Sequence, residues 1–307
     1  MTSAVGAAAA SVVGGRPRGA WAQGSAGALR ETPLRDGATL ISGAGSNIVV
    51  LRTAGAAAVV DSGPPERAAE LAKLVRGDLG LLSVELLFNT HWHPAHTGGN
   101  EALRSGDTDI VAHEITRLWM SAEHYVDWED KTYAPRVAAA LPTRTFYSSD
   151  PQPLVMEIGD EELEYGHLPD AHTDGDIYVW LKERNVLVAG GAVTIGEYPV
   201  IDHATGGWIG GLVDATKKLL ALTNADTLIV PANGPAQPRS HLTAQLEMLT
   251  VVRERIENLM RDGRSIAEML DAEVTKEFDA KWGDNRERFV ANIYDGLWWA
   301  GRLSDSL

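Results

Sequence analysis

The chain of 307 residues contains no cysteine. Without thiols it can form no disulfide bond, and it has no thiolate to offer a metal ion. Any metal ion that it binds must therefore be held by nitrogen and oxygen atoms, which means histidine and carboxylate side chains above all. The absence of cysteine does not by itself indicate a cellular compartment.

Positive charge is also scarce. Lysine and arginine total 27 against 42 aspartates and glutamates, which gives a formal net charge of −15. An acidic surface repels a phosphate backbone, so the composition argues against nucleic acid as a partner. No run of about 18 or more apolar residues occurs, and no segment is predicted to span a membrane. These absences leave a globular protein of ordinary composition.

The first 25 residues lack the charged start of a secretion signal. No basic residue precedes Arg16, and no twin arginine occurs in the chain. Ala20 and Ala22 nevertheless stand in the A-x-A arrangement of a cleavage site, after a small apolar stretch. Two interpretations stay open. One is the remnant of a secretion signal, on a periplasmic or secreted protein. The other is a disordered Ala/Gly tail, on a protein that stays in the cytoplasm.

Two series of strands and helices follow. The first begins with β-rich segments, continues with helical periodicity after Pro64 and Pro65, and ends in the apolar strand 84–89. Strands, a helix and a further strand between residues 153 and 231 form the second series. The repeat predicts two β-rich halves packed face to face with helices outside, a layered α/β sandwich.

Two further stretches have helical spacing. Residues 114–126, EITRLWMSAEHYV, are predicted to form a helix that carries His124. Residues 239–307 show helical spacing throughout and few strand signals.

Histidines gather directly after the apolar strand 84–89. The segment NTHWHPAHTGGN places His91, His93 and His96 within six positions. In an extended segment residues i and i+2 point the same way, so His91 and His93 can face one point, and a turn after Pro94 can bring His96 nearby. Imidazole is the commonest zinc ligand, so the pattern favours a metal site at the end of a buried strand. The alternative is a hydrogen-bonded surface loop.

The segment FNTHWHPAHTGGNE resembles the second motif of the metallo-β-lactamase superfamily, usually H-x-H-x-D-H. VVDSG, which contains Asp61, resembles the first motif, and LPDAHTDGD, which contains His172, the third. VLVAGGAV and IVPANGP stand in the places of the fourth and fifth. The five motifs stand in family order over about residues 38–235, and the resemblance implies an αββα sandwich. We expect this domain to occupy residues 26–238, preceded by the leader 1–25 and followed by a helical extension, 239–307, packed on the same domain.

The family usually binds two zinc ions. The resemblance implies that the three histidines of the first zinc site are His91, His93 and His172. It also implies that Asp61 orients the metal loop from outside the ligand set.

The second zinc site departs from the family pattern. Ala95 replaces the aspartate of this site, Asn233 replaces a histidine, and Gly191 replaces the aspartate that bridges the two ions. Of the usual ligands of the second site, only His96 is kept. We therefore expect one zinc ion per chain. On the same reasoning, restoring the three family residues together should restore the second ion.

The expected activity is that of a mononuclear zinc-dependent hydrolase, which uses zinc-bound water on a small ester, lactone or amide. The expected catalytic residues are His96, Asn233 and His203, the last from the loop GEYPVIDHATGGW. The alternative is a family member without hydrolytic turnover, either a metal-free or single-metal binding protein or a lyase or isomerase. Trp298 and Trp299 near the end of the chain are consistent with a homodimer interface.

Overall fold

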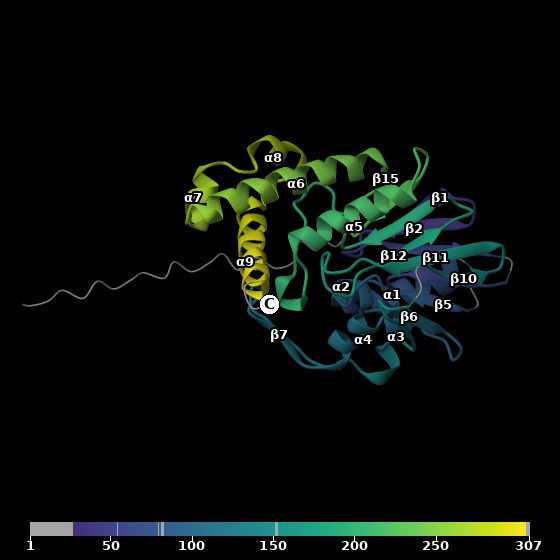
Figure 1. Ribbon diagram of the computed structural model, residues 1–307. Helices are drawn as coiled ribbons and strands as arrows, with labels where there is room; N and C mark the ends of the chain where they lie inside the picture. Colours follow the sequence, from purple (N-terminus) through teal and green to yellow (C-terminus); the bar gives the residue numbers. More distant parts are fainter. Residues whose placement is uncertain (1–26, 54, 79, 81–82, 151–152, 305–307) are drawn as a thin grey trace, which may run out of the picture.

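The computed structural model describes residues 27–304 except 54, 79, 81–82 and 151–152 (Figure 1). The leader predicted for residues 1–25 lies outside the described residues. Among the helices of the described part, none is both long and apolar enough to cross a bilayer.

The first sheet has seven strands in the order β1-β2-β3-β4-β5-β6-β9. Its first four strands pair antiparallel as a meander, and β4, β5, β6 and β9 then run parallel. The strands are β1 (Arg30–Arg35), β2 (Ala38–Ser42), β3 (Ile48–Arg52), β4 (Ala57–Val60), β5 (Leu86–Phe88), β6 (Asp109–His113) and β9 (Arg144–Phe146).

The second sheet has six strands in sequence order, β10 to β15. Neighbouring strands of this sheet pair antiparallel, with the exception of β13 and β14. These two strands are parallel, because the helix α5 connects them. The strands are β10 (Leu154–Ile158), β11 (Glu161–His167), β12 (Ile177–Leu181), β13 (Val186–Gly190), β14 (Leu228–Pro231) and β15 (Gln237–Pro238).

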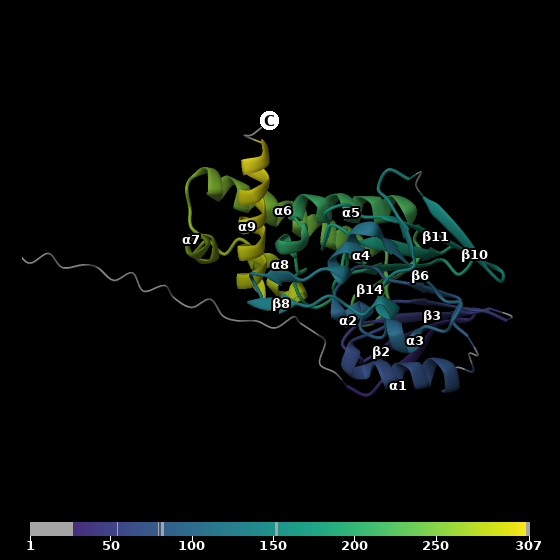
Figure 2. The same ribbon diagram turned by 90° about the horizontal axis from the view of Figure 1, so that it is seen from below.

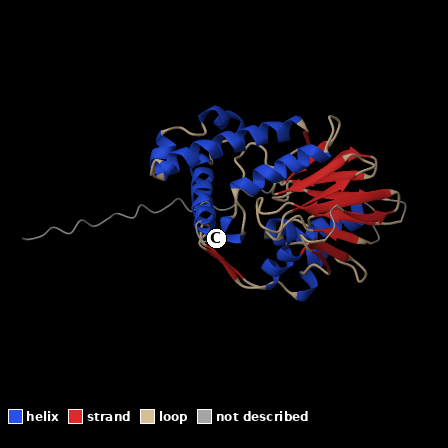
Figure 3. Ribbon diagram, viewed as in Figure 1, coloured by secondary structure: helices blue, strands red, loops and turns tan. Residues whose placement is uncertain are grey.

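Helices cover the outer face of each sheet. Those of the first half are α1 (Ala68–Lys73), α2 (Pro94–Thr97), α3 (Asn100–Leu103) and α4 (Glu114–Ser121), with short turns at Pro65–Arg67, Leu74–Asp78 and Ala138–Ala140. The second half contributes η4 (His203–Thr205), α5 (Ile209–Leu222), α6 (Ser240–Arg261), α7 (Ile266–Asp271), α8 (Lys276–Trp282) and α9 (Arg286–Ser304). Figure 3 shows the strands of the two large sheets gathered in one part of the molecule and the last helices at the other.

Three hydrophobic cores separate these layers. Alternate residues of both sheets, among them Val49, Phe88 and Val179, fill the space between the sheets. A second core lies between the first sheet and α1, and a third joins the outer face of the second sheet to α5, α6 and the last helices. The result is a four-layer αββα sandwich with C-terminal helices, as the sequence predicted (Figure 2).

The C-terminal helices belong to the third core. Trp282 of α8 and Phe289 of α9 are buried there together with residues of α5 and α6. Trp298 on α9 is 52% exposed. The division of the chain at residue 238 and the homodimer stay predictions.

The prediction of a helix over 114–126 is wrong in its second half. Helix α4 ends at Ser121, and His124 lies on β7 (His124–Val126), which forms a separate hairpin with β8 (Lys131–Tyr133). The turn of this hairpin includes Asp130 at φ 53°. A short apolar run fits a helix and a strand equally well, and here the pairing with β8 decides.

Candidate metal centre

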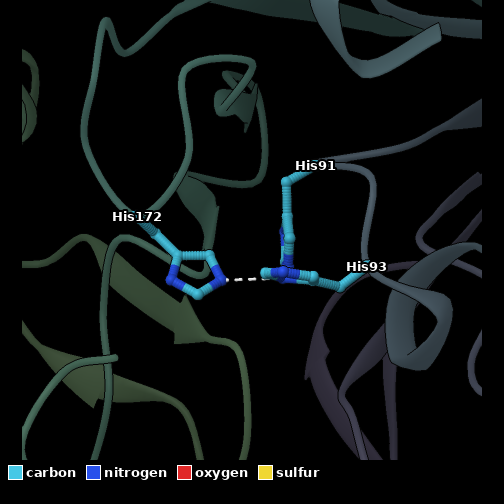
Figure 4. Close-up of side chains that lie close together, drawn as sticks. All are labelled: His91, His93 and His172. Atoms are coloured by element: carbon cyan, nitrogen blue, oxygen red, sulfur yellow. Dashed lines mark hydrogen bonds between the residues drawn. The ribbon is translucent and has the colours of Figure 1, made fainter. Parts of the chain in front are cut away.

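Three histidines from two distant loops meet at the edge of the sandwich. His91 and His93 follow β5, and His172 lies between β11 and β12. One ring nitrogen from each lies within 4.8 Å of the others, and all three side chains are buried. Figure 4 shows the three rings converging. The structure thus brings together the three residues that the sequence assigned to one metal ion.

The hydrogen bonds of these rings determine which nitrogens carry protons. The Nδ1 of His172 lies 2.6 Å from the carbonyl oxygen of Val200, which can only accept, so this nitrogen donates. In the same way Nε2 of His93 donates to the carboxylate of Asp202 over 3.1 Å. In a neutral ring the other nitrogen then carries no proton and can only accept.

The unprotonated nitrogens of His93 and His172 face each other. His172 Nε2 and His93 Nδ1 are 2.9 Å apart (Figure 4). Burial lowers the pKa of His93 to about 3 and that of His172 to about 4, so both rings are neutral at neutral pH. Two lone pairs at this distance repel unless a cation lies between them, and the donor set therefore fits a metal ion.

The ring of His91 is also held through one of its two nitrogens. The hydroxyl of Thr90 donates to Asp61 over 2.8 Å, so its oxygen can accept from Nδ1 of His91 at 3.0 Å. That leaves Nε2 of His91 as the free nitrogen. Burial also lowers the pKa of His91 well below its ordinary value. All three rings are thus held as neutral ligands by partners on their far side.

Asp61 connects two of the histidines. It accepts from the backbone and hydroxyl of Thr90, and also from Nδ1 of His96 at 2.7 Å. Its backbone has φ 62°, a left-handed conformation that Asp adopts more readily than most residues. Asp61 therefore touches the metal loop from behind and lies outside the ligand cluster.

Asp202 is a carboxylate whose role the sequence analysis did not identify. It is fully buried and accepts from His93, Thr205 and Trp128. Burial opposes its charge, but these hydrogen bonds prevail and lower the pKa of Asp202 to about 2. Asp202 stays ionised and fixes the tautomer of His93.

Aromatic residues support this carboxylate. Trp92, Met120, Val126 and Tyr133 form a small buried core, against which Trp119 and Trp128 pack. The indole nitrogen of Trp92 donates to Thr205, which in turn donates to Asp202. Trp92 thus holds Asp202 through Thr205, and Trp128 holds it directly. These hydrogen bonds join residues that are far apart in the sequence.

A pocket opens beside the three histidines. Its lining includes His96 and Asn233, together with Ala95 and Gly191. The three positions that depart from the family pattern therefore line one pocket together with His96. Glu197, a residue that the sequence analysis did not consider, also lines the pocket.

His203 lies apart from this pocket. It is not among the residues that line the pocket, and its Nε2 lies 3.4 Å from Asp127, which is 64% exposed. The structure thus brings His96 and Asn233 to the trio but places His203 against the β7–β8 hairpin.

Neutralising Asp202 should weaken metal binding. In the Asp202→Asn variant the charge that orients His93 is lost, and we expect zinc affinity to fall by about 10- to 100-fold. Competition with a chelating dye measures this. Asp127→Asn, a change to an exposed carboxylate on the same side of the molecule, is the control and should bind zinc like the parent. Equal affinities for all three proteins would contradict the role of Asp202.

Comparisons with known proteins agree with this centre. Residues 41–246 match the family model of the metallo-beta-lactamase superfamily. A metallo-beta-lactamase from Pontibacter korlensis is 21% identical with a TM-score of 0.57, and the match covers 72% of this chain and 99% of that one. The sec-alkylsulfatase Pisa1 from Pseudomonas sp. is 14% identical with a TM-score of 0.67.

The match to the alkylsulfatase covers 87% of this chain but 50% of Pisa1, so the chain spans about half of that protein. No curated protein matches the sequence significantly. At these identities the structural likeness shows the fold alone. The family model, however, covers more than half of the chain and includes all three histidines of the trio. The chain therefore belongs to the metallo-beta-lactamase superfamily.

Proposed function

We propose that the protein is a zinc-dependent hydrolase that holds one zinc ion on His91, His93 and His172 and cleaves a small ester, lactone or amide. The observation that carries the proposal is the convergence of three buried histidines beside a pocket, where Nδ1 of His93 and Nε2 of His172 lie 2.9 Å apart. When bound there, zinc would supply a Lewis acid and an activated water. The family includes hydrolases, which supports the reaction class.

The residues that line the pocket have complementary roles in this proposal. His96 donates from Nδ1 to Asp61, so its Nε2 is free to accept a proton or a hydrogen bond from the attacking water. The side-chain amide of Asn233 can donate to a substrate oxygen, although it is a poor zinc ligand. We assign no catalytic role to His203, because it contacts Asp127 and does not line the pocket.

The test is a panel of esters, lactones, amides and β-lactams, assayed with metal-free and zinc-loaded protein. We expect slow or no turnover of β-lactams and zinc-dependent turnover of at least one other class. Activity that survives complete removal of the metal would contradict the proposal. Zinc binding without turnover of any class would favour the alternative, a family member that binds a ligand without hydrolysis.

A further inference from the structure

Glu197 lies in the loop between β13 and α5 and lines the same pocket as the trio, His96 and Asn233. Among the described residues that line the pocket, it is the only carboxylate. Glu197 belongs to none of the family motifs, so the sequence gives no signal of a role for it.

The C-terminal helices hold this loop in place. Asn285, just before α9, accepts from the backbone nitrogen of Tyr198 and donates to its carbonyl oxygen. The ring of Tyr198 stacks on Phe289 of α9, with centroids 4.6 Å apart. On the other side the hydroxyl of Thr194 donates to the carbonyl oxygen of Glu197 over 3.0 Å. The backbone of Glu197 is therefore fixed at the pocket from both sides.

The surroundings of Glu197 favour its protonated form. Burial raises the pKa of Glu197 to about 7, and Arg288 of α9 opposes the shift without cancelling it. Arg288 also acts on Glu129 of the β7–β8 hairpin, so its charge is shared between two carboxylates. The pocket that Glu197 lines is also lined by the three histidines of the trio and by His96.

We propose that Glu197 is the general acid of the reaction and protonates the leaving oxygen of a substrate with a poor leaving group, such as an alkyl ester. This inference rests on the proposed function. The side chains that would hold a second cation beside His96 are replaced by Ala95, Asn233 and Gly191. The negative charge that develops on a leaving alkoxide must therefore be neutralised by a proton.

Atoms and protons balance in the proposed step. Water adds to the acyl carbon, and the bond from that carbon to the leaving oxygen breaks. The leaving oxygen takes the carboxyl proton of Glu197, and Glu197 regains the proton that the attacking water releases. One ester and one water become one acid and one alcohol.

The experiment compares ethyl acetate with p-nitrophenyl acetate, which share the acyl group and differ in the leaving oxygen. Nitrophenolate leaves without protonation, whereas ethoxide does not. We expect Glu197→Gln to lower kcat/KM for ethyl acetate by about 10²- to 10⁴-fold. The same variant should leave kcat/KM for p-nitrophenyl acetate nearly unchanged. Glu129→Gln is the matched control. Burial raises the pKa of Glu129 to about 7 as well, but Glu129 does not line the pocket. In Glu129→Gln the ratio of kcat/KM for ethyl acetate to kcat/KM for p-nitrophenyl acetate should therefore match that of the parent.

The pH profile gives a second readout. A carboxyl group is a proton donor only below its pKa, so hydrolysis of ethyl acetate should decline as pH rises through about 7, the pKa of Glu197. This decline should be missing in Glu197→Gln and present in Glu129→Gln. Zinc content and melting temperature should match the parent in both variants.

Three outcomes would overturn the inference, and they are distinguishable. An equal loss on both esters would assign Glu197 a structural or binding role. A loss of bound metal in Glu197→Gln would make it a metal ligand. If the zinc-loaded parent hydrolysed no ester at all, the proposed function would fail, and the acid role would fail with it.

Discussion

One zinc ion per chain is the expected result when the protein is saturated with zinc, dialysed and measured by elemental analysis. Replacing His91, His93 or His172 by Ala should lower the content from about one to near zero, because a three-ligand site does not survive the loss of a ligand. Bound zinc should also raise the melting temperature of the parent, because it binds the folded chain, and this increase should be absent in the three variants.

His96→Ala is the matched control for this experiment. His96 is a buried histidine of the same loop whose Nδ1 donates to Asp61, and it is not a member of the three-histidine cluster. Its replacement should leave close to one zinc per chain. Two tightly held ions in the parent would show that residues outside the family pattern complete a second site, and the single-metal proposal would then be wrong.

Replacing Gly191 by Ala should disrupt the site almost as strongly as removing a ligand. A Cβ atom on Gly191 would lie 2.2 Å from Cδ2 of His172 and 3.0 Å from its Nε2. The ring cannot easily give way, because it is buried and its Nδ1 is held by Val200. We expect zinc affinity to fall by at least about tenfold, and the free energy of unfolding of the metal-free protein to fall by about 1–3 kcal/mol from overpacking.

Gly106→Ala is the control for this prediction. A Cβ atom there would meet nothing within 4 Å, and the backbone is not left-handed, so stability and zinc affinity should match the parent. Titration with a chelating dye and thermal unfolding measure the two quantities. If Gly191→Ala bound zinc as tightly as the parent, the position of His172 against this glycine would be wrong.

The same contact changes an expectation that the sequence alone suggested. Aspartate at position 191, together with Asp at 95 and His at 233, was expected to restore a second metal ion. In the structure the side chain at position 191 would collide with the ring of His172, a proposed ligand of the first ion. We therefore expect Gly191→Asp to lose the first metal ion and not to gain a second.

Most of the fold could be predicted because its signals are periodic and local. The strands β3, β5 and β13 are apolar on successive residues, which indicates burial on both faces, and α5 and α6 repeat their apolar residues at helical spacing. The β7–β8 hairpin was missed because three residues are too few for a period to distinguish strand from helix.

The clustering of the three histidines could be predicted for a different reason. His91 and His93 are two residues apart, so local geometry alone directs them to one point. His172 is 79 residues from His93, and only the order of the family motifs connected the two. The resemblance also placed Ala95, Gly191 and Asn233 at the second site, and the structure does gather them around one pocket.

The sequence by itself determined the layered sandwich, the chemistry of the donors and the loss of the usual second set of ligands, because residue types, spacing and motif order carry that information. Only the tertiary structure decided which groups hold and complete the site. Asp202 reaches His93 across 109 positions of the chain, and Tyr198, next to Glu197, is held by Asn285 across 87. Gly191 makes room for the ring of His172. Such contacts have no period and no local signature, because they depend on how the sheets and the last helices pack against each other.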